Sequence, residues 1–292
     1  MSKPLGIFTE FNDLSATEQE LVRLAWKAAE SSALHQLCFQ SKFPVGAAIL
    51  AANDTGCAKV FLGCNVENDF FPPAICAERG AVMAAVVEGY TRFLSIAVVC
   101  QKVPGGSPCG LCRQVLRQFG LDAVLLSVVD QESNVRRSTS GELLPAASGA
   151  PLSCSTLSPC DQRMVRRLVA LKSRSHVPYS RKPRAALFIA DNARGKQAVF
   201  SGVSDDNASF GGSALAESVA MRAARTAGYS KAVRLMVTVE DPAGINPIAG
   251  ECLQVLREFG AEAPVWLVGQ DSSTVISSLE ELLPDSFGPE SL

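Results

Sequence analysis

The feature that most constrains how this chain folds is an internal repeat. Short strings of the first half return in the second half, in the same order, 139 or 140 positions later. Amphipathic helices that merely look alike would not keep a nearly fixed shift, so the sequence predicts a tandem duplication. The matched strings and residues are Asn65-Val-Glu-Asn68 with Ser204-Asp-Asp-Asn207, Glu78 with Glu217, Tyr90 with Tyr229, Glu142-Leu-Leu-Pro145 with Glu281-Leu-Leu-Pro284, and Gln114-Val-Leu-Arg117 with Gln254-Val-Leu-Arg257.

The length agrees with two domains. A chain of 292 residues provides about 140–150 residues for each copy, which is a usual domain size. Residues 147–162 are rich in Ser, Pro, Gly and Ala, which is typical of a linker with turns. We therefore expect a first domain over residues 1–150 and a second over residues 160–292.

Each half carries the same order of predicted helices and strands. Short β-branched runs alternate with helical patterns, which predicts an α/β domain with helices packed on a central sheet. The predicted helices cover 17–30, 76–88, 161–172 and 215–227, with further helices starting after Pro108 and near Gly250. The predicted strands cover 45–51, 60–64, 95–100, 123–129, 185–190, 197–203, 233–239 and 263–268.

Composition excludes several classes of protein. The formal net charge of −2 argues against a dedicated nucleic-acid binder, which usually carries a basic excess. No apolar run approaches the roughly 18–20 residues that span a bilayer, and the first residues do not have the pattern of a secretory signal. We expect a cytoplasmic protein with no membrane partner, in which clustered cysteines bind metal or take part in catalysis.

Three cysteines form a candidate metal site. Cys109 and Cys112 are three apart at the predicted start of a helix, and Cys76 stands at the start of another. Helix N-termini stabilise thiolates through backbone N–H groups and the helix dipole. Three protein ligands leave one tetrahedral position open, which is the pattern of a catalytic zinc ion rather than a structural one.

Two charged residues follow the first of these cysteines. Glu78 is two residues from Cys76, close enough to reach a bound water without ligating the metal, and so to act as a proton shuttle. Arg79 offers hydrogen-bond donors that would offset the excess negative charge of three thiolates. A solvent-facing helical arginine is the alternative for Arg79.

The Cys109–Cys112 pair has alternative interpretations. It could be a redox pair of the thioredoxin kind or half of a structural zinc knuckle, with Cys64 or Cys100 as a further ligand. Both of these cysteines end apolar strands, where a small buried thiol is the usual finding. The Cys76-Ala-Glu78 string favours the catalytic interpretation.

Together these strings resemble the cytidine deaminase family. The matching stretches are SKFPVGAAI (41–49), GCNVEN (63–68), ICAER (75–79), EGY (88–90), SPCGLCRQVLRQFG (107–120) and ELLPDSFGPE (281–290). The resemblance implies two three-layer domains, each with a mixed sheet between helices. It also implies zinc-dependent deamination of free cytidine, with deoxycytidine as a further substrate, to uridine or deoxyuridine and ammonia in pyrimidine salvage. The two-domain layout is similar to that of the dimeric members, whereas the all-cysteine ligand set is similar to that of the tetrameric ones.

The resemblance also implies substrate-binding residues in the first half. Asn65 and Glu67 resemble the pair that binds the ribose 3′-hydroxyl, and Phe43 resembles the aromatic residue that packs against the nucleoside. The alternatives are turn formation at a strand end for Asn65 and Glu67, and simple core packing for Phe43.

The second half has lost the metal ligands. Leu215 stands opposite Cys76 and Ala249 opposite Cys109, while Cys252 alone keeps its thiol. We therefore expect one Zn²⁺ per chain, bound in the first half only, and a second domain that is a degenerate copy.

The second half instead keeps residues that the tetrameric members donate to neighbouring subunits. Ala208, Phe210 and Phe287 match this donor pattern, whereas the first half has Asp69 opposite Ala208 and Ser148 opposite Phe287. The resemblance therefore implies that these three residues help to close the active sites of a homodimer.

Three rival functions remain open on the sequence. The first is deamination of a base within RNA or DNA, for which the Arg-rich stretch 163–184 is the one candidate surface. The second is a non-catalytic zinc-binding scaffold, and the third is deamination of a cytosine-containing antibiotic. An intact Glu78 argues against the second, and Asn65 with Glu67 against the first and third.

Overall fold

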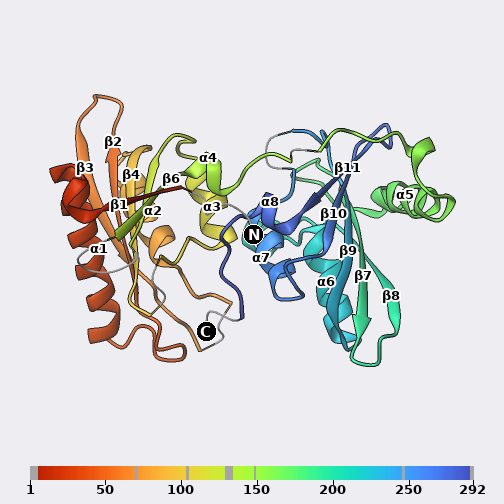
Figure 1. Ribbon diagram of the computed structural model, residues 1–292, viewed down its shortest axis with the longest axis horizontal. Coiled ribbons are helices and arrows are strands. Elements are labelled where there is room, and N and C mark those ends of the chain that lie inside the picture. The colour runs from red at the N-terminus through yellow and green to blue at the C-terminus, as the bar shows by residue number, and fades with distance from the viewer. Residues whose placement is uncertain are drawn as a thin grey trace. The chain divides into compact units, whose positions relative to one another are not determined.

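The computed structural model describes residues 6–69, 72–102, 105–128, 134–147, 149–244 and 247–289. It divides the chain into two compact units, unit 1 (Met1–Leu144 with Asp285–Leu292) and unit 2 (Pro145–Pro284) (Figure 1). This division differs from the expected ranges 1–150 and 160–292 at both ends of the second copy. Unit 2 begins at Pro145, before residue 150. The segment after Pro284 belongs to unit 1, where Asp285 is hydrogen-bonded to two arginines.

Unit 1 is built on a mixed six-stranded sheet in the order β1-β6-β5-β4-β2-β3. The strands β4 and β5 are parallel, and the other neighbours are antiparallel. The strands are β1 (Ile7–Glu10), β2 (Val45–Ala52), β3 (Ala58–Cys64), β4 (Arg92–Cys100), β5 (Val124–Val128) and β6 (Asn134–Thr139). A parallel pair needs a crossover, and the helix α3 (Gly110–Arg117) provides it between β4 and β5.

Helices cover both faces of this sheet. The helix α1 (Ala16–Leu34) packs with Ala48, Ala97 and Val99 in one apolar cluster. The helix α2 (Ala77–Val87) and Leu116 of α3 pack on the opposite face in a second cluster, with α4 (Ser140–Leu143) at its margin. Along β2, residues 47, 49 and 51 belong to the second cluster and residue 48 to the first, as the alternation of side chains in a strand requires.

Unit 2 repeats this plan with one strand fewer. Its sheet has the order β11-β10-β9-β7-β8, with β9 and β10 parallel and the other neighbours antiparallel. The strands are β7 (Ala185–Asn192), β8 (Gln197–Val203), β9 (Tyr229–Thr238), β10 (Pro264–Val268) and β11 (Thr274–Ser278). The helices are α5 (Pro159–Leu171), α6 (Ala216–Thr226), α7 (Gly250–Arg257) and α8 (Leu279–Leu282). Short 3-10 turns lie at 154–156, 172–174 and 210–212 in this unit and at 11–13 in unit 1.

The predicted fold class is confirmed, since both units are α/β with a mixed sheet flanked by helices. The prediction missed β1, β6 and β11, which are short and carry polar residues such as Arg136 and Arg137. Val129, the predicted end of one strand, lies outside the described residues, as do Phe71 and Ser148. No helix of the described residues is long and apolar enough to cross a membrane.

A glycine allows α2 to lie directly against β3. A Cβ atom at Gly63 would come within 2.2 Å of the Ala77 carbonyl oxygen and 2.4 Å of the Ala81 nitrogen. The same contact recurs in unit 2, where a Cβ at Gly202 would lie 2.2 Å from the Ala216 carbonyl oxygen. Because α2 begins next to Cys76, this close approach sets the height of the candidate metal site above the sheet.

We predict that Gly63→Ala lowers the free energy of unfolding by about 3 kcal/mol or more. The added methyl group would overlap backbone atoms of α2, which cannot move away without displacing the helix. Gly80→Ala, in the same helix, is the matched control. Its Cβ would be 3.7 Å from the nearest atoms, and alanine is the better helix former, so a small gain of about 0.5–1 kcal/mol is expected. Urea unfolding of both variants measures the difference. Equal stability of Gly63→Ala and the wild type would contradict the close approach.

Candidate metal centre

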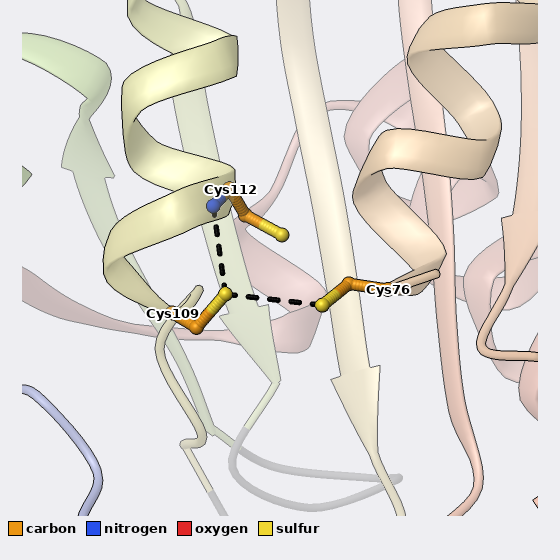
Figure 2. Close-up of side chains that lie close together, drawn as sticks. All are labelled: Cys76, Cys109 and Cys112. Atoms are coloured by element: carbon orange, nitrogen blue, oxygen red, sulfur yellow. Dashed lines mark hydrogen bonds between the residues drawn. The ribbon is translucent and has the colours of Figure 1, made fainter. Parts of the chain in front are cut away.

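The three predicted cysteine ligands come together where two helices begin. Cys76 is the residue before α2, and Cys109 is the residue before α3, with Cys112 in its first turn (Figure 2). Their sulfur atoms all lie within 4.8 Å of one another. Both helices start on the same face of the sheet of unit 1, so the fold unites residues that are more than thirty positions apart.

The spacing of the sulfur atoms fits a tetrahedral metal ion. Cys76 Sγ and Cys109 Sγ are 3.8 Å apart. Two thiolates, each about 2.3 Å from one tetrahedral zinc ion, lie about 3.8 Å from each other. A donor set of three sulfurs favours zinc among the common divalent ions. The chemistry of the three sulfurs and the spacing of this pair therefore fit zinc.

Without a metal, the cluster concentrates negative charge on one sulfur. The thiols of Cys112 and Cys76 hydrogen-bond to Cys109 and hold the pKa of Cys109 well below its usual range. The backbone N–H of Cys112 also donates to Cys109 Sγ at 3.5 Å. The hydrogen bond to Cys109, followed by burial, raises the pKa of Cys76 to about 11, and that of Cys112 rises well above its usual value for the same reasons. A bound cation would take the place of the protons on Cys76 and Cys112.

Glu78 is buried beside the sulfur atoms. It lies in the first turn of α2 and is only 4% exposed. Burial, and then electrostatic repulsion from Cys76 in its thiolate form, raise the pKa of Glu78 to about 7. Contact with Cys112 and the charge of Arg79 oppose this shift. A carboxyl group in these surroundings can both accept and release a proton near neutral pH.

Arg79 places a positive charge next to the same sulfurs. Its Nη2 donates to the Ala74 carbonyl oxygen at 2.8 Å, and its Nε is buried with no hydrogen-bond partner in the described part of the chain. Partial burial alone would lower the pKa of Arg79, but the attraction of Cys76 and Cys112 in their thiolate form raises it overall. The side chain is thus oriented by a carbonyl group and acts on the thiolates through its charge.

The geometry does not favour the two alternatives for the Cys109–Cys112 pair. Cys109 and Cys112 are both free thiols, so no disulfide links this pair. Among the described residues, the group with metal-ligand spacing contains Cys76, Cys109 and Cys112 and no fourth ligand. Cys64 and Cys100, at the ends of β3 and β4, are not part of this group. The cluster thus offers three candidate ligands to a metal ion.

The side-chain amide of Asn65 is hydrogen-bonded to the protein through both its oxygen and its nitrogen. Its Oδ1 accepts from Ser32 Oγ and from the Val45 backbone N–H, both at 2.8 Å. Its Nδ2 donates to the Phe43 carbonyl oxygen at 2.8 Å. Asn65 therefore fixes the backbone on both sides of Pro44, at the entry to β2.

Glu67 holds the same loop at an earlier point. Its carboxylate accepts from the backbone N–H of Gln40 at 2.6 Å and of Ser41 at 3.2 Å. Slight burial alone would raise the pKa of Glu67. The hydrogen bonds to Ser41 and Gln40, with the charge of Lys42, outweigh this effect and lower the pKa overall. Phe43, at the end of this loop, is half-buried. Asn65 and Glu67 thus hold in place the loop that carries Phe43.

Unit 2 has different chemistry at the positions equivalent to the metal ligands. Glu217 is fully buried, and Arg184 Nη2 lies 3.2 Å from its Oε1. The angles of this contact do not make a hydrogen bond, and neither carboxylate oxygen has one within the described residues, so charge alone pairs the two groups. Burial raises the pKa of Cys252 well above its usual value. A guanidinium group is therefore the cation nearest to Glu217 in unit 2.

Three residues, Ala208, Phe210 and Phe287, are predicted to help close the active sites, and they are distant in sequence from the three cysteines. Ala208 is exposed, and Phe210 is 76% exposed, with its ring edge-on to Tyr179 at 6.3 Å. Phe287 is half-buried in the C-terminal segment that belongs to unit 1.

Sequence reasoning missed three polar residues that support the site. Ser32 orients Asn65 from α1, and Arg113 and Arg136 bond the loop that precedes Cys109. Arginine is rarely buried unless it is paired, so a pattern alone places it at the surface. The one available signal was the position of Arg113 directly after a predicted ligand.

Comparison with known proteins agrees with this site. Residues 15–128 match the family profile described as the cytidine and deoxycytidylate deaminase zinc-binding region. A cytidine deaminase of Sporosarcina psychrophila is 39% identical over 107 residues, which are 37% of this chain and 76% of that protein. A probable cytidine deaminase of Dictyostelium discoideum is 41% identical over 128 residues, 44% of this chain and 83% of that one. A crystal structure of cytidine deaminase from Burkholderia pseudomallei is 36% identical and covers 45% of this chain and 98% of its own, with a TM-score of 0.39.

The fold and the three-sulfur site of unit 1 define a zinc-binding α/β enzyme. The chain belongs to the cytidine deaminase family, since it covers more than two thirds of relatives that are over 30% identical to it.

We predict that Asn65→Ala lowers the free energy of unfolding by about 2 kcal/mol or more, because it leaves the Val45 backbone N–H and the Phe43 carbonyl oxygen without their partner. Asn53→Ala is the matched control. Its Oδ1 accepts from Thr55 and Cys57 in an exposed turn, so about 1 kcal/mol or less is expected. Urea unfolding compares the two. Equal losses would show that Asn65 does not hold the loop.

Proposed function

We propose that unit 1 is a zinc-dependent hydrolase that converts free cytidine, and deoxycytidine, to uridine or deoxyuridine and ammonia in pyrimidine salvage. The observation that carries this proposal is the buried Glu78 beside three sulfurs with zinc spacing and no fourth ligand among the described residues. The family of the chain supports the reaction, since its relatives include cytidine deaminases.

Cys76, Cys109 and Cys112 would hold the zinc ion. Zinc in a site with three protein ligands supplies Lewis-acid activation of water. With two positive charges against three thiolates, the site would carry a net negative charge, which weakens that activation. The charge of Arg79 beside Cys76 and Cys112 reduces this excess.

Glu78 moves the protons of the reaction. Its carboxylate takes a proton from the attacking water and passes it to the ring nitrogen of the base. It then assists the departure of the amino group as ammonia. One water is consumed and one ammonia released, so the carboxyl group returns to its starting state. The burial of Glu78 keeps bulk water away from this transfer.

The loop held by Asn65 and Glu67 is proposed to bind the sugar, with Phe43 against the nucleoside. Family resemblance assigns Asn65 and Glu67 to the 3′-hydroxyl, and the hydrogen bonds to Phe43, Gln40 and Ser41 give both residues a second role in shaping the loop. A site that binds a free 3′-hydroxyl favours a nucleoside over a base within a polynucleotide. Reduced thiols at the metal centre suit a cytoplasmic enzyme.

One zinc ion per chain is proposed, in unit 1 only. Unit 2 has Leu215 and Ala249 where unit 1 has ligands, and Cys252 is a single sulfur. The Arg184 guanidinium already lies against Glu217. A second positive ion there would meet an existing cation.

Residues 1–150 and 160–292 are proposed to be the catalytic and the degenerate copy of one duplicated domain, acting as a homodimer. The proposed role of the second copy is to complete the active sites with Ala208 and Phe210, together with Phe287 from the C-terminal segment. The high exposure of Phe210 supports this, since a large apolar side chain left in water gains from contact with another surface.

We predict that the purified chain contains about one zinc per chain and deaminates cytidine, and that Glu78→Gln retains zinc but loses turnover by at least about 10²–10⁴-fold. Elemental analysis measures the metal, and the fall in ultraviolet absorbance of cytidine follows the reaction.

The matched control is Glu217→Gln, the same change at the equivalent buried position of unit 2, which is expected to leave turnover within about twofold of the wild type. Zinc without turnover of cytidine or deoxycytidine in the wild type would contradict the proposal, and RNA would then be the next substrate.

A further inference from the structure

The C-terminal segment is bonded to unit 1 through Asp285. The Asp285 carbonyl oxygen accepts from Arg113 Nη2 at 3.2 Å, and its carboxylate forms an ion pair with Arg136 Nη1 at 2.8 Å. Asp285 has a φ of +51°, in the left-handed region that aspartate tolerates better than most residues. One residue thus binds two arginines, through its backbone and through its side chain.

Arg113 connects Asp285 to the residues that precede the metal ligand Cys109. Its Nε donates to the Pro108 carbonyl oxygen at 2.7 Å, and its Nη2 also donates to Ser107 Oγ at 3.0 Å. Arg113 is only 1% exposed. Burial lowers the pKa of its guanidinium group to about 10, so the group stays charged at neutral pH. A buried cation is retained in a fold only where several acceptors surround it.

Arg136 makes a second connection to the same loop. It lies on β6, is 9% exposed, and donates through Nη2 to the Gly105 carbonyl oxygen at 2.9 Å. Gly105 N–H donates in turn to the Val128 carbonyl oxygen at 3.0 Å. The loop from Gly105 to Pro108 therefore has a guanidinium contact at each end, and both guanidinium groups lead to Asp285.

The internal repeat shows that this arrangement belongs to the metal-binding copy alone. Leu253 stands at the position equivalent to Arg113, and Val275 at the position equivalent to Arg136. Ala146 follows the first Glu-Leu-Leu-Pro string where Asp285 follows the second. Both arginines are therefore absent from the copy that lost its ligands, and the aspartate is found only at the end of the chain.

We propose that Asp285, through Arg113 and Arg136, is a positioning residue for the metal ligand Cys109. The inference rests on the metal site of the proposed function. It assigns to the C-terminal segment the task of fixing the loop before α3, so that Cys109 meets Cys76 at the spacing that zinc requires. Outer contacts of this kind typically change metal affinity 10–100-fold.

Two substitutions separate the side-chain contact from backbone strain. Asp285→Gly removes the carboxylate and also any strain at positive φ, while the backbone carbonyl that Arg113 uses remains. Asp285→Asn keeps an oxygen acceptor for Arg136 and tolerates the same φ. The matched control is Arg234→Gln, which breaks a comparable half-buried ion pair in unit 2, between Arg234 and Asp161 at 2.5 Å.

Zinc affinity of the full-length chain is measured by competition with a chromophoric chelator. The ligand geometry is followed by the absorption of the cobalt-substituted protein, because sulfur-to-cobalt charge-transfer bands report the thiolate ligands directly. We expect Asp285→Gly to weaken zinc binding by about 10-fold and to alter the cobalt spectrum. We expect Asp285→Asn to restore most of the affinity and Arg234→Gln to leave it unchanged.

Unchanged zinc affinity and an unchanged cobalt spectrum in Asp285→Gly would overturn the inference, and so would an equal loss in Arg234→Gln. A wild-type chain that binds no zinc would instead contradict the proposed function, so the two failures are distinguishable.

Discussion

The crowding of three sulfur atoms and a buried carboxyl group at one point is the constraint on which the rest of unit 1 depends. Such a group of potential anions is unfavourable inside a protein unless nearby positive charge or dipoles stabilise it. The N-termini of α2 and α3 supply dipoles, and Arg79 supplies a full charge. Gly63 lets α2 lie directly on β3, which keeps the start of this helix close to the sheet. A bound zinc ion would complete this balance of charge.

The two copies show the same scaffold under different electrostatic demands. Both keep a glycine beneath the helix and a buried glutamate in its first turn. In unit 1 the glutamate faces thiols that a metal can bridge, whereas in unit 2 Glu217 faces the guanidinium of Arg184. A buried carboxylate needs a compensating cation, and the two copies answer this need in different ways.

Much of the site could be predicted from the sequence because its chemistry is local. Cys76 and Glu78 share one helical turn, as do Cys109 and Cys112, and the spacing itself predicts a shared ion. The hydrogen bonds of Asn65 could not be predicted, since they depend on how α1 and the loop before β2 pack. The contact of Asp285 with Arg113 could not be predicted either. A sequence pattern does not show that an arginine is buried, and the two residues are 172 positions apart. Short polar strands such as β6 were missed for a related reason, as only tertiary pairing stabilises them.

The open coordination of the zinc ion is the central claim, and X-ray absorption at the zinc edge tests it most directly. A chain loaded with one zinc ion is expected to show three sulfur neighbours at about 2.3 Å and one lighter atom at about 2.0 Å. That result would establish a three-cysteine site with one position left for a water or substrate atom. Four sulfur neighbours would indicate a closed structural site, and a shell of oxygen and nitrogen atoms alone would place the metal elsewhere. Either result would contradict the account.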